Sequence, residues 1–233
     1  MERPGDAHAI QETTVAKTLA MVTIGQAPRT DMVPEIVAWL RQPVRIEEFG
    51  SLDGLTAKAV AGLAPRTGEH RLVTRLTDGS EAIVGKMQTH ERLQKLFTRL
   101  DGQGYDLIVL LCTGHFPAFQ VRTPFLEAQL AVDNMVQALT YGQQTLGVLV
   151  PNKLQIAEFH GIEGKPVKAA CVSPYSGGAF AEAGRSLAAT DLIVMHCMGY
   201  TEAMRQAVKE GSGRPVLLAR RLLAAAIDLR LED

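Results

Sequence analysis

The chain has 233 residues, of which 46% are hydrophobic and 21% charged, and its formal net charge is −1 at pH 7. This composition is ordinary for a soluble globular protein of one or two domains, and a near-neutral chain gives no electrostatic reason to expect a nucleic-acid partner. No apolar run is long enough to span a bilayer, and residues 1–16 lack a signal-peptide pattern. The three cysteines, an odd number without a disulfide-like spacing, fit a reducing compartment. We therefore expect a cytoplasmic protein with no membrane partner and a flexible N-terminal extension over residues 1–16.

In the first half of the chain, short apolar runs alternate with helical patterns. The expected strands are 18–24 and 44–49, and the expected helices are 31–41, 56–63 and 88–100. Asp31 is the expected N-cap of the first helix. Residues 71–76 and 81–84 flank an Asp78-Gly79 turn, which predicts a β-hairpin. Because this hairpin interrupts the alternation, we expect it to be an insertion near residues 70–85 at a sheet edge.

The second half repeats the alternation. A helix is expected from just after Pro124 to about Tyr141, and the strands and helices that follow are expected at 145–150, 154–160, 167–172, 179–188, 201–209 and 215–219, with a closing helix from Arg220. Alternating strands and helices predict an α/β fold with mostly parallel sheets. The expected division is a first lobe of residues 17–124 plus the closing helix 220–233, and a second lobe of residues 125–219.

One apolar stretch occurs twice. Residues 106–114 and 191–199 match in register at Asp, Leu, Ile, Val, Cys and Gly. Each copy is a continuous β-branched run, which is typical of a strand covered on both faces. Each run ends in Cys-x-Gly, and ligands collect at the carboxyl ends of parallel strands. We therefore expect two pseudo-symmetric, Rossmann-like (flavodoxin-like) lobes with a ligand cleft between them.

Cys112 and Cys197 end the two repeated strands. A thiol near backbone N–H groups and a helix N-terminus is expected to favour the thiolate. A thiolate and a thiol on opposite sides of a carbon acid form a base and an acid, and backbone N–H groups of Thr113-Gly114 would stabilise the enolate. This predicts racemisation or epimerisation without a cofactor. The alternative is that both are ordinary core cysteines, which is the interpretation we favour for Cys171.

Histidines lie near both cysteines. His115 is three residues after Cys112, and His196 precedes Cys197. Strand alternation would point His196 away from Cys197, and no Cys-x-x-Cys is present, so no metal is expected. His196 is interpreted as a strand histidine with its hydrogen bonds satisfied. His115 is either a pocket hydrogen-bonding group or a plain loop residue.

Loops after the first strand of each half offer polar side chains. Arg29 either clamps a substrate carboxylate or is a solvated loop residue. Asn152 either lines the same cleft or caps the following helix. The loop that begins Gly25-Gln26 has neither a dinucleotide glycine pattern nor a P-loop lysine, so no nucleotide cofactor is expected.

The sequence resembles a known family at three places. Met21-Val-Thr-Ile-Gly-Gln-Ala-Pro-Arg-Thr-Asp31, Gln103-Gly-Tyr-Asp-Leu-Ile108 and Cys197-Met-Gly-Tyr200 resemble the AroM family, which is similar to the aspartate/glutamate/hydantoin racemase superfamily. That resemblance covers nearly the whole chain beyond the N-terminal extension. It implies two α/β lobes around a substrate cleft with one catalytic cysteine from each lobe, which fall on Cys112 and Cys197.

The chain departs from amino-acid racemases beside both cysteines. Those enzymes usually have Cys-Asn-Thr at the first site and Cys-Thr at the second, where this chain has Cys112-Thr113-Gly114 and Cys197-Met198-Gly199. Aspartate and glutamate are therefore not the expected substrates, and a small carboxylate-bearing ligand is expected instead. A decarboxylase that uses one cysteine, and a binding or regulatory protein without turnover, are the alternatives, and a homodimer is possible. The expected substrate-binding residues are Gln26, Arg29, Thr113, Gly114, His115, Asn152, Met198, Gly199 and Tyr200.

Overall fold

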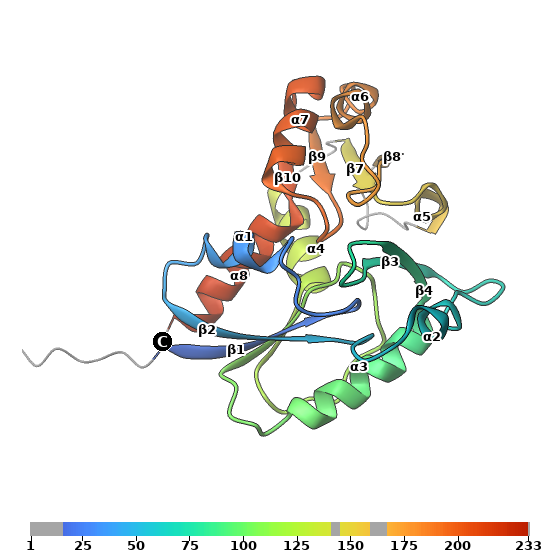
Figure 1. Ribbon diagram of the computed structural model, residues 1–233. Helices are drawn as coiled ribbons and strands as arrows, with labels where there is room; N and C mark the ends of the chain where they lie inside the picture. Colours follow the sequence, from blue (N-terminus) through green and yellow to red (C-terminus); the bar gives the residue numbers. More distant parts are fainter. Residues whose placement is uncertain (1–15, 141–144, 159–166, 233) are drawn as a thin grey trace, which may run out of the picture.

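The structure, a computed structural model, describes residues 16–140, 145–158 and 167–232. It contains two four-stranded parallel sheets, one in each of two lobes, and a separate antiparallel hairpin (Figure 1). None of the described helices is both long and apolar enough to cross a membrane. Residues 1–15, which make up nearly all of the expected N-terminal extension, lie outside the described residues.

The two sheets have the same strand order. The first sheet runs β2 (Val44–Gly50), β1 (Lys17–Thr23), β5 (Leu107–Leu110), β6 (Phe125–Glu127). The second runs β8 (Val167–Cys171), β7 (Leu146–Val150), β9 (Leu192–Met195), β10 (Val216–Leu218). In each lobe the strand before the cysteine is the third along the chain and pairs with the first in parallel. The predicted pseudo-symmetric α/β fold is therefore confirmed.

Most of the described helices can each be assigned to a single lobe. The first lobe carries α1 (Val33–Val37), α2 (Ala57–Ala61) and α3 (Lys86–Leu100), and the second carries α5 (Lys153–Glu158), α6 (Phe180–Ser186) and α7 (Glu202–Ser212). The helices α4 (Ala128–Leu139) and α8 (Ala219–Leu231) follow the last strand of each sheet and pack against each other, and α8 also contacts α1. Figure 1 shows α4 and α8 at the junction of the lobes.

The lobes share a hydrophobic core. Leu19 and Met21 on one face of β1 belong to a cluster that also contains Val148 of β7, Val132 of α4 and residues of α8. The opposite face of β1 packs against a second cluster that contains α3. Both faces of this strand are therefore buried, as its continuous apolar sequence predicts.

Two predicted elements differ from the structure. The segment after Pro124 begins with β6, which pairs with β5, and α4 starts only at Ala128. The first helix spans only Val33–Val37, and Asp31 does not cap it: both carboxylate oxygens of Asp31 accept hydrogen bonds from Arg29 instead.

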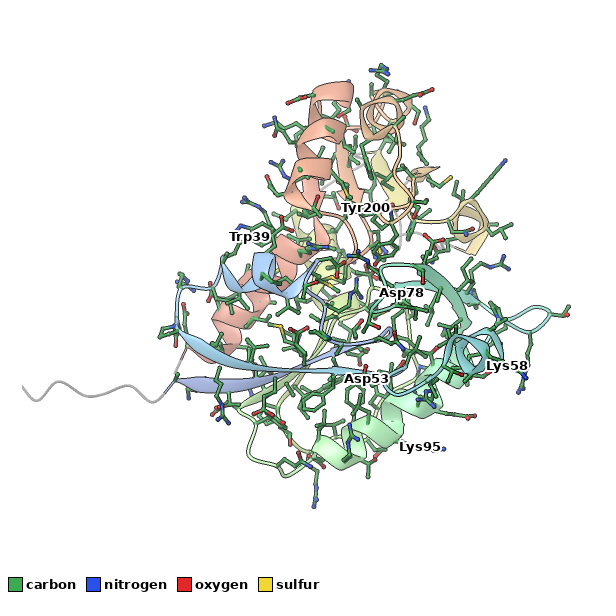
Figure 2. The ribbon with its side chains drawn as sticks, viewed as in Figure 1. Trp39, Asp53, Lys58, Asp78, Lys95 and Tyr200 are labelled. Carbon is green, nitrogen blue, oxygen red and sulfur yellow. The ribbon has the colours of Figure 1, made fainter. Side chains whose placement is uncertain are left out.

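The hairpin is an independent two-stranded sheet rather than an edge of a larger one. It consists of β3 (Arg71–Arg75) and β4 (Glu81–Gly85). It reaches the second lobe, where Ser173 Oγ donates to Glu81 at 2.6 Å and Gln155 Nε2 donates to the Arg71 carbonyl at 3.4 Å. The hairpin turn, marked by Asp78 in Figure 2, lies below this lobe. The insertion therefore closes one side of the junction between the lobes.

Candidate active site

A cavity of about 430 Å³ lies between the lobes, near the carboxyl ends of β1, β5, β7 and β9. Both repeated cysteines line it. The predicted site residues in its lining are Arg29, Cys112, Thr113, Gly114, His115, Cys197, Met198 and Gly199. The repeated sequence therefore brings its two Cys-x-Gly loops to one cavity.

The two thiols have matching surroundings. Cys112 and Cys197 are 7% and 9% exposed. The backbone N–H of Gly114 donates to Cys112 Sγ at 3.3 Å, and that of Gly199 donates to Cys197 Sγ, also at 3.3 Å. Each Cys-x-Gly sequence thus folds into the same small turn, in which the glycine N–H stabilises negative charge on the sulfur.

The expected preference for the thiolate is wrong. Burial raises the pKa of Cys112 to about 12, and the N–H of Gly114 lowers it only in part. Burial also raises the pKa of Cys197, although Gly199, Arg29 and Arg220 oppose that shift. No helix starts beside Cys112, because β6 precedes α4, so the expected helix dipole does not act there. Both cysteines are therefore neutral thiols at pH 7.

Arg29 lines the cavity, but its guanidinium group is already engaged. Its Nε and Nη2 donate to the two oxygens of Asp31 at 2.9 and 3.0 Å, and Nη1 donates to Thr23 Oγ1 at 2.9 Å. Burial alone would lower the pKa of Arg29, but the bonds to Asp31 and Tyr175 raise it. The planar fork expected to clamp a substrate carboxylate is thus occupied by Asp31, whose charge offsets that of Arg29, and Arg29 also holds the Tyr175 hydroxyl at the cavity.

Tyr175 is a cavity residue that the sequence analysis missed. Its hydroxyl oxygen accepts a hydrogen bond from Arg29 Nη2 at 3.2 Å, and it lies against Gly199, where an added Cβ would come within 2.5 Å of it. Burial raises the pKa of Tyr175, so the hydroxyl keeps its proton at neutral pH. In the part of the chain that the structure describes, no group accepts that proton. The hydroxyl can therefore donate to a ligand. Its place after the carboxyl end of β8 is the sequence signal that could have identified it.

A carboxylate on α4, also missed, lies beside the cavity histidines. Asp133 contacts both His115 and His196. The interpretation of His196 as a strand histidine with a satisfied side chain agrees with its bonds, since its backbone N–H donates to the Leu149 carbonyl of β7 and its ring contacts Asp133. His196 lines the cavity with its ring bonded to Asp133, and His115 also lines it. Asp133 gave no sequence signal, because only the fold brings the middle of α4 to both loops.

Three expected substrate-binding residues lie outside the cavity lining. Gln26 Nε2 donates to the Leu52 and Leu55 carbonyls, so its amide is used to fix a neighbouring loop. Asn152 Oδ1 accepts from the Leu154 N–H at the start of α5, which is the capping role left open above. Tyr200 is fully buried within the second lobe (Figure 2), and its hydroxyl donates to the Val172 carbonyl.

The hairpin forms a wall of the cavity. Leu72, Val73 and Thr74 of β3 line it, and an added Cβ at Gly114 would come within 2.7 Å of Leu72 Cδ2.

Cationic side chains also line the cavity, namely Arg29, Arg71 and Lys86, whereas no aspartate or glutamate in the described parts of the chain does. The cavity is thus electrostatically suited to an anion.

The described residues contain no group of three His, Cys, Asp or Glu side chains that could hold a metal ion. The cysteines and histidines at the cavity instead make separate contacts: each thiol accepts a backbone N–H, and His115 and His196 both contact Asp133. The side chains that line the cavity offer two thiols, the Tyr175 hydroxyl and the imidazoles of His70, His115 and His196.

Solved structures with the same fold include three kinds of protein. One is arylmalonate decarboxylase, with a TM-score of 0.55 and 17% identity over 92% of this chain and 91% of that chain. Another is the Nocardia farcinica maleate cis-trans isomerase, in a variant with a covalently bound succinylcysteine intermediate, with a TM-score of 0.59 and 13% identity over 93% of each chain. The third is the Picrophilus torridus aspartate racemase, with a TM-score of 0.53 and 11% identity over 91% of this chain and 93% of that chain. At these identities the similarity establishes a common two-lobed fold.

Sequence comparison assigns the family. A search of curated protein sequences finds no significant match. The family model described as AroM protein matches residues 19–228, which covers both sheets and both cysteine loops. The chain therefore belongs to the AroM family, and its fold is that of the racemase-like proteins.

Proposed function

We propose that the protein is a cofactor-independent enzyme that moves a proton at a carbon next to a carboxylate, with Cys112 and Cys197 as the acid–base pair. The observation that carries this proposal is the pair of thiols in one cavity. Each stands at an equivalent strand end of its lobe, and each accepts an N–H from the glycine two residues later. Two equivalent groups on opposite sides of a ligand suit removal of a proton from one face and its return to the other.

In the proposed reaction one thiol must first ionise. Burial of the sulfur opposes this ionisation, but the glycine N–H strengthens its hydrogen bond as the sulfur becomes negative. The thiolate then takes the Cα proton of the substrate, and the other thiol donates its proton to the opposite face. Racemases, epimerases and isomerases of that type share this step. The Tyr175 hydroxyl, which Arg29 supports, is placed to donate to an oxygen of the enediolate that develops in between.

The charge of the cavity supports an anionic substrate. Arg29, Arg71 and Lys86 line it without a carboxylate among the described lining residues. Lys86 has no ion-pair partner within the described chain, so its charge is available to a ligand. A small carboxylic acid is therefore the substrate class that we propose.

Proton exchange in D2O tests the proposal. The protein is incubated with chiral α-amino, α-hydroxy and hydantoin-like acids, and loss of the Cα proton signal is followed by NMR. We expect exchange with at least one substrate, and we expect Cys112→Ser or Cys197→Ser to reduce it by at least 100-fold. The matched control is Cys171→Ser, since Cys171 lies in β8 and outside the cavity lining, and it should keep the wild-type rate.

Two other results would point to different functions. Decarboxylation needs only one thiol to protonate the enolate. A decarboxylase would therefore release carbon dioxide from malonate-type acids, and one of the two serine variants would keep this activity. Absence of exchange across the panel, with ligands that still raise the melting temperature, would contradict the proposal and favour a binding protein. The neutral resting state of both thiols is the observation that favours this second candidate.

A further inference from the structure

The carboxylate of Asp133 connects the loops of both cysteines. Asp133 Oδ1 lies 2.7 Å from His196 Nε2, and Oδ2 lies 3.3 Å from His115 Nε2. His196 directly precedes Cys197, and His115 follows Cys112 by three residues. One side chain thus contacts the first lobe's loop through one oxygen and the second lobe's loop through the other.

The protonation state of Asp133 defines these contacts. Burial alone would raise its pKa, but the hydrogen bonds from His115 and His196 outweigh burial and lower it. An ionised carboxylate only accepts hydrogen bonds, so both ring nitrogens must donate. Gln129 Nε2, one helical turn earlier, donates to Oδ2 at 2.8 Å. Hydrogen bonds from His196 and Gln129, together with the 3.3 Å contact of His115, hold the carboxylate in a fixed orientation.

The helix that carries Asp133 is firmly packed. This helix is α4, whose Val132 and Val136 are fully buried in the core that both lobes share. A further hydrogen bond joins the two loops directly, from Thr113 Oγ1 to the His196 carbonyl at 3.2 Å. The loops are therefore tied to each other and to one helix that belongs to the common core.

We propose that Asp133 is a positioning residue that sets the separation and orientation of Cys112 and Cys197 through His115 and His196. It does not face the substrate carbon in this role. Instead, it holds each histidine, and each histidine holds its loop. The kinetic consequence rests on the proposed function, but the spacing of the thiols is measurable without any turnover.

The spacing test uses bifunctional thiol reagents. In a Cys171→Ser background, the protein is treated with bis-methanethiosulfonates of graded length, and the fraction with Cys112 linked to Cys197 is measured by mass spectrometry. We expect one sharply preferred length. Asp133→Ala should broaden the preference and reduce linkage at that length by at least fivefold. Asp133→Asn should have a smaller effect, since its amide retains one acceptor oxygen.

The matched control is Asn134→Ala, which changes the next residue of α4, exposed to solvent, and should keep the wild-type preference. With a substrate in hand, Asp133→Asn should lower kcat at least tenfold and leave KM within about threefold, because spacing affects proton transfer more than binding.

An unchanged length preference in a folded Asp133→Ala protein would overturn the proposal. If that variant does not fold, the same measurement on Asp133→Asn decides. If wild-type protein exchanges no proton with any acid, the proposed function fails, whereas the linkage profile still decides the role of Asp133.

Discussion

At the scale of single residues, the cysteine loops show two opposing effects. The glycine N–H groups stabilise a thiolate, and burial of the sulfur destabilises it more. The sequence contains the first effect, because Cys-x-Gly forms a local turn. It does not contain the second, because the burial of Cys112 comes from tertiary packing in a cluster that also contains Leu72 of the hairpin and Leu93 of α3.

The pH dependence of alkylation follows from the raised pKa values. The pKa of each thiol is raised above the ordinary value of 9.0, and that of Cys112 is raised to about 12. Since only the thiolate reacts, iodoacetamide should modify Cys112 and Cys197 about tenfold faster for each pH unit between pH 7 and 9. Peptide mass mapping of protein without ligand measures both rates. A rate at either cysteine that is flat across this range would show a pKa below 7 and contradict the assignment.

At the scale of elements, two helices of the second lobe approach closely through glycine. A Cβ added to Gly211 of α7 would lie 2.0 Å from the Ala181 carbonyl oxygen of α6, and one added to Gly184 of α6 would lie 2.3 Å from that of Val208. Because the obstacles are backbone atoms, the helices would have to separate.

Gly211→Ala should therefore lower the free energy of unfolding by about 2 kcal/mol, as overpacking usually does. The control is Gly62→Ala at the end of α2, where φ is −67° and the nearest atom to an added Cβ is 3.3 Å away. Its effect should stay within about 0.5 kcal/mol. Urea unfolding followed by circular dichroism compares the two, and equal effects would rule out close helix packing.

The elements that the sequence predicted well are those with strong local signals. Local sequence alone is enough to recognise the continuous apolar runs of β1, β5, β7 and β9 and the Asp78-Gly79 turn. The strand β6 has only three residues, and its sequence merges with the helical pattern of α4. The predicted cap at Asp31 failed because Arg29 competes for the same oxygens. Asp133 reaches the site only through the tertiary structure and had no local signature, whereas Tyr175 had only its place after the end of β8 as a signal.

At the scale of the whole molecule, one arginine joins the lobes. Arg220, at the start of α8, is completely buried. It donates to the carbonyls of Met198 and Gly199 in the second cysteine loop, at 2.6 and 3.0 Å. It also reaches the first lobe, where it bonds the Asp31 carbonyl at 2.9 Å and the Glu35 carboxylate at 2.7 Å. Its removal would leave acceptors of both lobes without donors.

Arg220→Met should lower the free energy of unfolding by about 3–5 kcal/mol, the usual cost of breaking a buried ion pair from one side. The neighbouring Arg221→Met is the matched control. Arg221 is exposed, pairs with Glu202 and lies over Trp39, so its loss should cost about 1 kcal/mol or less. Calorimetry of both variants measures the difference. Similar melting temperatures for both would show that Arg220 does not join the lobes.

The two lobes share a strand order, but their residues around the cavity differ. This difference has a stereochemical consequence. Arg220 and Gln129 occupy the second position of α8 and α4, yet one binds the loop of Cys197 and the other binds Asp133. The two faces of a bound ligand therefore meet different surroundings. Mirror-image substrates are equally stable in water, so a racemase must have the same kcat/KM for both. Under the proposed racemase reaction, kcat and KM would each be free to differ between the two enantiomers, and only their ratio would be constrained.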